Sequence, residues 1–214
     1  MRFKGFDRLA MEARRKAIHL SGLSVPASIL IFGKAATAGF VALALLAALV
    51  LERRRLAGYV SLPTSRDHEE ERVAGYVYYI WGTLLTVLVF PPPIAIAAML
   101  MLSLGDAASG IIGSLVRGSA VRAEIMEGRD WRPKPLPIMA ATFAVCLLAG
   151  YVAVILEETF LAGPGLLSPP IYIAGAAAAT FADAVPLSFR ERVIDDNLSI
   201  PVLSGGAMFV VGLL

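Results

Sequence analysis

An aspartate in the middle of an apolar run is the first feature of this sequence that could do chemistry. In residues 99–116, MLMLSLGDAASGIIGSLV, the flanks of Asp106 are as apolar as those of a membrane helix. An aspartate at the centre of a bilayer costs roughly 3 kcal/mol, so such a residue is by default a functional hypothesis. A structural hydrogen bond between helices is the alternative. Asp183, in ATFADAVP, is a second carboxylate of this kind and weakens that alternative.

A group of oxygen ligands follows in DDNLSIP, where Asp195, Asp196 and Asn197 are consecutive. Carboxylate and amide oxygens suit hard divalent cations, and Mg²⁺ typically takes one or two carboxylates together with substrate phosphates. The alternative is an N-cap on the next helix, supplied by Asp196 or Asn197. Pro186, shortly after Asp183, predicts that the preceding helix ends or kinks near the inner membrane face.

Basic residues that could bind phosphate occur near the N-terminus and on either side of a loop in the middle of the sequence. Arg15, Lys16 and His19 have helical spacing in EARRKAIHLSG, while Arg117 and Lys134 flank a long basic loop. The alternative for the first group is a membrane anchor that snorkels to anionic headgroups. Taken with the carboxylates, these cations favour Mg²⁺-dependent phosphate chemistry on a lipid headgroup, in which catalysis is mostly positioning and charge neutralisation.

Other residues carry weaker signals. Gly105 and Gly110 flank Asp106, where small residues allow either close helix packing or the approach of a phosphate chain; no P-loop lysine follows them. His68 lies beside glutamates, but the chain has only two histidines, which excludes a zinc protease site of the usual spacing. Cys146 and the aromatic residues of GYVYYIWG are interpreted as packing and interface residues.

The composition of the chain predicts the elements that must position these residues. Of the 214 residues, 57% are hydrophobic and 17% charged, and the mean hydropathy is +0.73. Soluble proteins average about 45–50% apolar and about 25% charged residues. We therefore expect an all-α integral membrane protein. The net charge of +2 is too small to indicate nucleic-acid binding.

Seven windows meet the length of about 17–25 predominantly apolar residues that a spanning helix needs. They are 17–33, 35–51, 73–90, 94–116, 136–156, 171–189 and 198–214. The positive-inside rule then predicts a cytoplasmic N-terminus and an outside C-terminus, because this arrangement leaves only Lys34 outside among the 19 basic residues. We expect one membrane domain over 1–214, a bundle of about seven transmembrane helices. Its multi-pass topology suits a prokaryotic plasma membrane or an ER-like membrane, with the active site facing the cytoplasm.

Three motifs in order give a family resemblance. RKAIHLSG, LGDAASGIIG and ADAVP followed by DDNLSIP make the sequence resemble the CTP-dependent lipid kinases. That family includes dolichol kinase, phytol and other polyprenol kinases, and the CTP-using diacylglycerol kinase. The resemblance implies transfer of the γ-phosphate of CTP, or of another nucleoside triphosphate, to the hydroxyl of a membrane lipid alcohol, with Mg²⁺ as cofactor.

The resemblance also implies roles for individual residues. Catalytic roles fall on Asp106, Asp183 and Lys134, and metal binding falls on Asp106, Asp195 and Asp196. Nucleotide or phosphate binding falls on Arg15, Lys16, His19, Gly105, Gly110, Arg117 and Asn197, and Pro201 completes the C-terminal motif. The sequence departs from the family after Lys134, where KPLPIMA lacks the usual Ser/Thr, Glu and Gly. Asp183 stands where Glu is common, and Arg117 substitutes for an arginine often found at Ser114.

Two other functions stay open. A membrane cytidylyltransferase that makes a CDP-lipid also uses CTP and Mg²⁺, but its usual Pro-Gly-His-Gly-Gly run is absent. A small ion- or proton-coupled transporter would use Asp106 and Asp183 as a relay; that class usually has repeat symmetry, and no repeat is visible here. The lipid itself (dolichol, phytol, a geranylgeraniol-type prenol or diacylglycerol) and a homodimer built on Gly/Ala stripes are not decided by the sequence.

Overall fold

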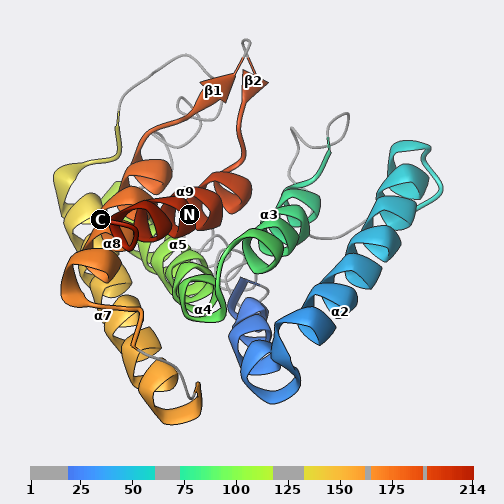
Figure 1. The fold of residues 1–214 in the computed structure, drawn as a ribbon. Helices are drawn as coiled ribbons and strands as arrows, with labels where there is room; N and C mark the ends of the chain where they lie inside the picture. Colours follow the sequence, from blue (N-terminus) through green and yellow to red (C-terminus); the bar gives the residue numbers. More distant parts are fainter. Residues whose placement is uncertain (1–18, 61–72, 118–132, 162–164, 190–191) are drawn as a thin grey trace.

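The computed structural model describes residues 19–60, 73–117, 133–161, 165–189 and 192–214, and within them the fold is helical apart from one short hairpin (Figure 1). The helices are η1 (Ser21–Leu23), α2 (Ser24–Leu56), α3 (Gly75–Val89), α4 (Pro92–Leu100), the π-helix η3 (Met101–Gly105), α5 (Asp106–Arg117), α7 (Leu136–Phe160), α8 (Pro169–Ala184) and α9 (Asp196–Val211). Strands β1 (Ser188–Phe189) and β2 (Arg192–Val193) pair antiparallel. The all-α prediction is confirmed.

The prediction of seven spans is wrong for the described residues. Three helical stretches are long and apolar enough to cross a membrane: Ser21–Leu56, Pro92–Gly113 and Leu136–Phe160. The seven windows were defined by their content of apolar residues, which does not show where a helix begins or ends. Helices α3, α8 and α9 have only 15, 16 and 16 residues, fewer than the roughly 20 that span the hydrocarbon core. The three long helices still indicate an integral, multi-pass membrane protein.

A bend at Gly33 explains why the first two windows fall in one element. Gly33 has φ +82° and ψ 167° inside α2, a backbone conformation that only glycine adopts readily. The hydroxyl of Thr37 donates to the Gly33 carbonyl at 2.9 Å and pairs with Ser28 at 2.9 Å across the bend. Windows 17–33 and 35–51 are therefore two helical arms that meet at a sharp kink at Gly33 (Figure 1).

We expect Gly33→Ala to lower the stability of the protein by about 1–3 kcal/mol, since a side chain at this φ and ψ is strained even in open space. Thermal unfolding in detergent micelles measures the effect. Gly39→Ala is the matched control, because Gly39 is helical, exposed and free of neighbours within 4 Å. The control is expected to be neutral or stabilising. Equal melting temperatures for both variants would contradict the bend.

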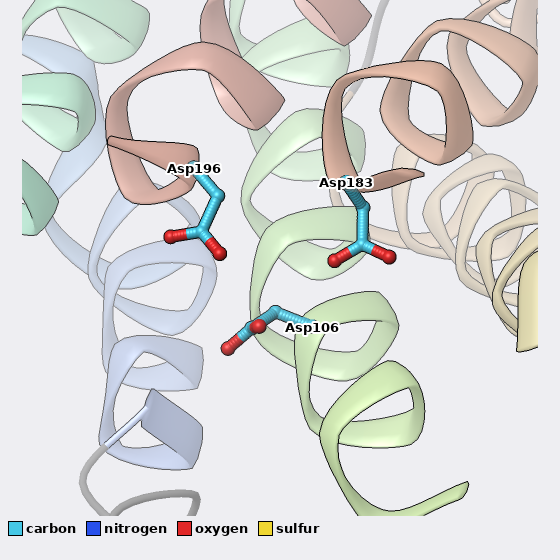
Figure 2. A group of neighbouring side chains, drawn as sticks. All are labelled: Asp106, Asp183 and Asp196. Atoms are coloured by element: carbon cyan, nitrogen blue, oxygen red, sulfur yellow. The ribbon is translucent and has the colours of Figure 1, made fainter. Parts of the chain in front are cut away.

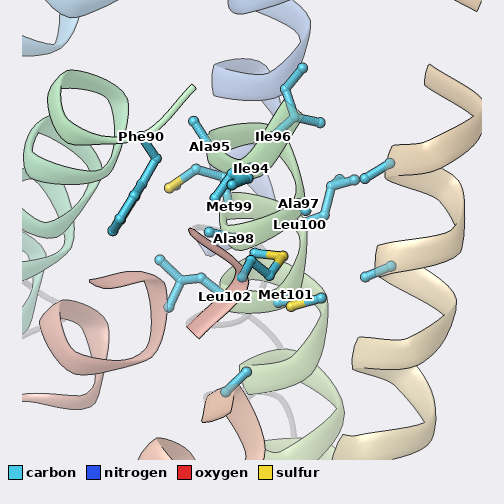
Figure 3. Packing of buried hydrophobic residues seen from close by; sticks show 14 of the residues in the cluster. Phe90, Ile94, Ala95, Ile96, Ala97, Ala98, Met99, Leu100, Met101 and Leu102 are labelled. Carbon is cyan, nitrogen blue, oxygen red and sulfur yellow. The ribbon is translucent and has the colours of Figure 1, made fainter. Parts of the chain in front are cut away.

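The continuous stretch α4–η3–α5 forms the centre of the bundle. Every residue from Ile94 to Leu102 is at most 6% exposed, as expected for a helix that is apolar on all sides. Figure 3 shows these side chains radiating from the central helix into its neighbours. Large apolar side chains on α2, such as Ile31, Phe40 and Leu43, are instead exposed, which suits contact with lipid. Asp106 therefore lies within this buried central stretch, directly after η3.

A buried ion pair joins the end of α2 to the start of α3. Arg55 donates two hydrogen bonds to Glu52, at 2.9 and 2.6 Å, and Glu52 also accepts from the Tyr76 hydroxyl and the Ala74 backbone N–H. Both charged residues are at most 9% exposed. From the sequence, Arg55 had no role beyond its place among the basic residues expected on the cytoplasmic side, and Glu52 had none. The four hydrogen bonds that Glu52 accepts connect the end of α2 to the start of α3, two helices that flank the site.

Candidate functional site

Three aspartates from three helices meet at one point. Asp106 is the first residue of α5, Asp183 is next to the last residue of α8, and Asp196 is the first residue of α9. One carboxylate oxygen from each lies within 4.8 Å of the others, and Figure 2 shows Asp183 and Asp196 directed toward Asp106. Asp106 and Asp183 are each 6% exposed. Carboxylates this close together repel one another unless one of them holds a proton or cations balance their charge.

The topology explains why α8 and α9 deliver aspartates to the same place. Helix α8 ends at Ala184, two residues before Pro186, as the proline predicts. The β1–β2 hairpin then returns the chain, with the Ile194 N–H donating to the Leu187 carbonyl at 2.7 Å. At Gly82, a Cβ would lie 2.7 Å from the Asn197 carbonyl oxygen. Helix α3 therefore packs closely on the first turn of α9 and fixes the position of Asp196.

Lys134 is the cation that faces Asp183. Its ammonium group donates to Asp183 Oδ1 at 2.7 Å and to Ser109 Oγ at 2.8 Å, and the Ser109 hydroxyl donates to Asp183 Oδ2 at 2.7 Å. The Lys134 backbone N–H donates to the Ala184 carbonyl at 3.0 Å. Lys134 is thus attached to α8 through both its backbone and its side chain. Both carboxylate oxygens of Asp183 accept a hydrogen bond.

His19 is the group that faces Asp106. Its Nδ1 lies 3.0 Å from Asp106 Oδ2, which is an ion-pair distance when the imidazole is protonated. The angle at this contact is unsuitable for a hydrogen bond, and Nδ1 has no hydrogen-bond partner among the described residues. The imidazole packs edge-on against the Tyr79 ring, with the ring centroids 5.2 Å apart. His19 therefore sits against a carboxylate on one side and an aromatic ring on another.

The start of α9 holds an unsatisfied acceptor on Asn197, the residue after Asp196. Asp195 is the N-cap of the helix, and its side chain accepts from the Asn197 backbone N–H at 3.0 Å. Asn197 is 6% exposed, and its Oδ1 has no hydrogen-bond partner in the part of the chain that is described. An unpaired buried acceptor costs about 1–3 kcal/mol and calls for a ligand, water or ion. The cap is Asp195, and not Asp196 or Asn197 as the alternative interpretation had it.

The π-helix η3 ends immediately before Asp106. Single-turn π-bulges inside α-helices occur frequently at functional sites, and this one lies within the buried central stretch of the described residues. At Gly105, the last residue of η3, a Cβ would lie 2.6 Å from Cys146 Sγ on α7. Glycine at this position is therefore required by close helix packing, the first of the two roles considered for it.

The remaining predicted site residues fall in different places. Arg15 and Lys16 lie outside the described residues, and Arg117 ends α5 with a side chain that is also outside them. Gly110 is buried within α5. Asp195 does not belong to the group of three aspartates, so its role as a metal ligand stays a prediction. Sequence reasoning missed Ser109, although it stands in the quoted motif one helical turn after Asp106.

The donor set fits the Mg²⁺ that the family resemblance implies. Asp106, Asp183 and Asp196 offer one carboxylate oxygen each within a small space, and the amide oxygen of Asn197 is buried without a partner among the described residues. Oxygen ligands, several of them charged, are what Mg²⁺ binds, with substrate phosphates completing its coordination.

Comparisons with family models, with curated proteins and with solved structures found no match to this chain.

Proposed function

We propose that this protein transfers the γ-phosphate of CTP, or of another nucleoside triphosphate, to the hydroxyl of a membrane lipid alcohol. The observation that carries the proposal is the meeting of Asp106, Asp183 and Asp196, next to Lys134 and His19, in an apolar multi-pass bundle. Phosphoryl transfer needs charge neutralisation and positioning more than covalent chemistry. A compact set of carboxylates and cations supplies both.

We also propose that the site faces the cytoplasm. Lys134 begins the chain's return into the membrane through α7, and Arg53 and Arg54 lie at the end of α2. In Figure 1 the end of α2 and the β1–β2 hairpin lie toward the same end of the bundle. Basic residues gather on the cytoplasmic side of membrane proteins. A soluble nucleoside triphosphate would then reach the aspartates from the cytoplasm, while the lipid alcohol stays in the bilayer.

In the proposed reaction, the oxygen of the lipid hydroxyl attacks the γ-phosphorus, and the bond from that phosphorus to the β–γ bridging oxygen breaks. The products are a lipid monophosphate and CDP. Asp106 takes the hydroxyl proton or, as the second role open to it, would hold the metal, in which case the proton passes to a phosphate oxygen of the nucleotide. Asp183 and Asp196 would hold Mg²⁺, which when bound would neutralise charge on the triphosphate. Lys134 and His19 provide positive charge for phosphate oxygens.

The test uses purified protein in detergent with Mg²⁺, a panel of prenols, dolichol and diacylglycerol, and CTP labelled on either the γ- or the α-phosphate. We expect only the γ-label to move into the lipid fraction, with the best acceptor identifying the substrate. Transfer of the α-label would contradict the proposal and indicate a cytidylyltransferase. Absence of transfer from CTP, ATP and GTP would also contradict it and would favour a transporter.

A further inference from the structure

We infer that Tyr79 is a positioning residue that holds Asp106 and His19 against each other. Its catalytic meaning rests on the proposed function, but its structural effect does not. Tyr79 lies on α3 and touches neither a carboxylate of the aspartate group nor Lys134 in any described contact. Its contacts are instead to the two elements that carry the facing groups, the π-helix before Asp106 and the segment that contains His19.

The first contact is with the π-helix. The Tyr79 hydroxyl lies 3.2 Å from Ser103 Oγ, and Ser103 is a fully buried residue of η3. Asp106 follows Ser103 by three residues, less than one turn of the widened helix. A π-helix has poorer intrinsic stability than an α-helix and persists as a single turn where its surroundings support it. A side-chain hydrogen bond from α3 to this turn supplies such support.

The second contact is with His19, through both its backbone and its ring. The Tyr79 hydroxyl donates to the His19 carbonyl at 3.4 Å, a long bond, and the two rings meet edge to face at 73°. This edge-to-face arrangement is the geometry that aromatic pairs prefer. One side chain on α3 therefore contacts both the backbone carbonyl of His19 and its imidazole, and fixes the position of the first and the orientation of the second.

Gly22 shows how closely the N-terminal segment is fitted to Tyr79. A Cβ at Gly22 would lie 1.5 Å from the Tyr79 hydroxyl oxygen and 3.0 Å from Ser103 Oγ. The backbone just after His19 thus passes directly over the Tyr79–Ser103 pair. The segment after His19, the Tyr79 side chain and Ser103 of η3 therefore pack against one another. Loss of the tyrosine hydroxyl should shift both His19 and Asp106, whose Nδ1 and Oδ2 atoms lie 3.0 Å apart.

The experiment compares Tyr79→Phe and Ser103→Ala with Thr83→Val. The control removes a buried hydroxyl from α3, one turn from Tyr79, where its one hydrogen bond among the described residues goes to the Tyr79 carbonyl at 2.8 Å. The direct readout is the ¹⁵N spectrum of histidine-labelled protein in micelles. The chain has only two histidines, so a His68→Ala variant assigns the His19 signals.

We expect Tyr79→Phe and Ser103→Ala to shift the His19 ring-nitrogen signals in the same direction, with no further shift in the double variant, because coupled residues are not additive. Thr83→Val should leave them unchanged. In the transfer assay, kcat should fall by about ten- to a hundredfold, the effect of displacing a catalytic group by about 1 Å, with KM for CTP nearly constant.

Unchanged His19 signals in both Tyr79→Phe and Ser103→Ala would overturn the inference, and so would an equal shift in Thr83→Val. The spectrum needs no turnover. If the wild-type protein transfers no phosphate while the spectrum behaves as expected, the proposed function fails and the positioning role stands.

Discussion

Asp106→Asn is expected to reduce phosphate transfer by at least about a thousandfold, the scale on which enzymes lose activity without a general base or a key electrostatic group, while the protein stays folded in detergent. The substitution preserves shape and removes one negative charge from three clustered carboxylates. Mutual repulsion in the cluster decreases. We therefore expect a melting temperature that is unchanged or higher, measured alongside the transfer rate.

A catalytic role and a purely structural role for Asp106 give opposite results in this experiment. A residue that only joined helices by a hydrogen bond would lose stability on substitution and keep its activity. Glu158→Gln is the matched control, because it also removes one carboxylate, from an exposed position near the far end of α7. The control should change neither quantity. Normal transfer by Asp106→Asn would eliminate the proposed role.

Lys134→Met is expected to have a large effect on both stability and activity. The Asp183 side chain is 2% exposed and would keep only its hydrogen bond from Ser109. Removing one partner of a buried ion pair costs about 3 kcal/mol, the lower end of the known range, because the Lys134 side chain is itself 30% exposed. Transfer should fall as well, since the variant removes a cation that we propose to contact the phosphates.

The double variant Lys134→Met/Asp183→Asn separates these two effects. With no buried charge left unpaired, most of the lost stability should return, whereas transfer should stay as low as in Lys134→Met. Arg53→Met, which removes an exposed cation at the end of α2, serves as the control for net charge. Recovery of both stability and transfer in the double variant would mean that the pair is purely structural.

The residue types at the site could be selected from the sequence, but their meeting could not be derived from it. Asp106 and Asp183 stood out because a carboxylate is costly in an apolar segment. Their proximity to Asp196 depends on where α8 ends, on the hairpin that follows and on the close packing of α3 against α9 at Gly82. These are tertiary contacts that a pattern of apolar residues does not contain.

The differences from the predicted fold have physical causes as well. Hydropathy counts apolar residues, so it could not recognise the kink at Gly33 between two helical arms, or that α3, α8 and α9 stop short of a full span. The roles of Ser109 and Tyr79 were missed for another reason. Both residues are ordinary in helices of this composition, and only their long-range partners, Asp183 for one and Ser103 for the other, distinguish them.

The most direct test of the central claim measures whether Asp106, Asp183 and Asp196 together bind a divalent cation. Electron paramagnetic resonance follows the free Mn²⁺ signal as the ion is titrated into purified protein, with and without CTP. We predict saturable binding that CTP strengthens. Each single Asp→Asn variant should weaken it roughly tenfold or more, because affinity depends on the number of charged ligands, and Glu158→Gln should not. Equal Mn²⁺ binding by the wild type and all three variants would contradict the account.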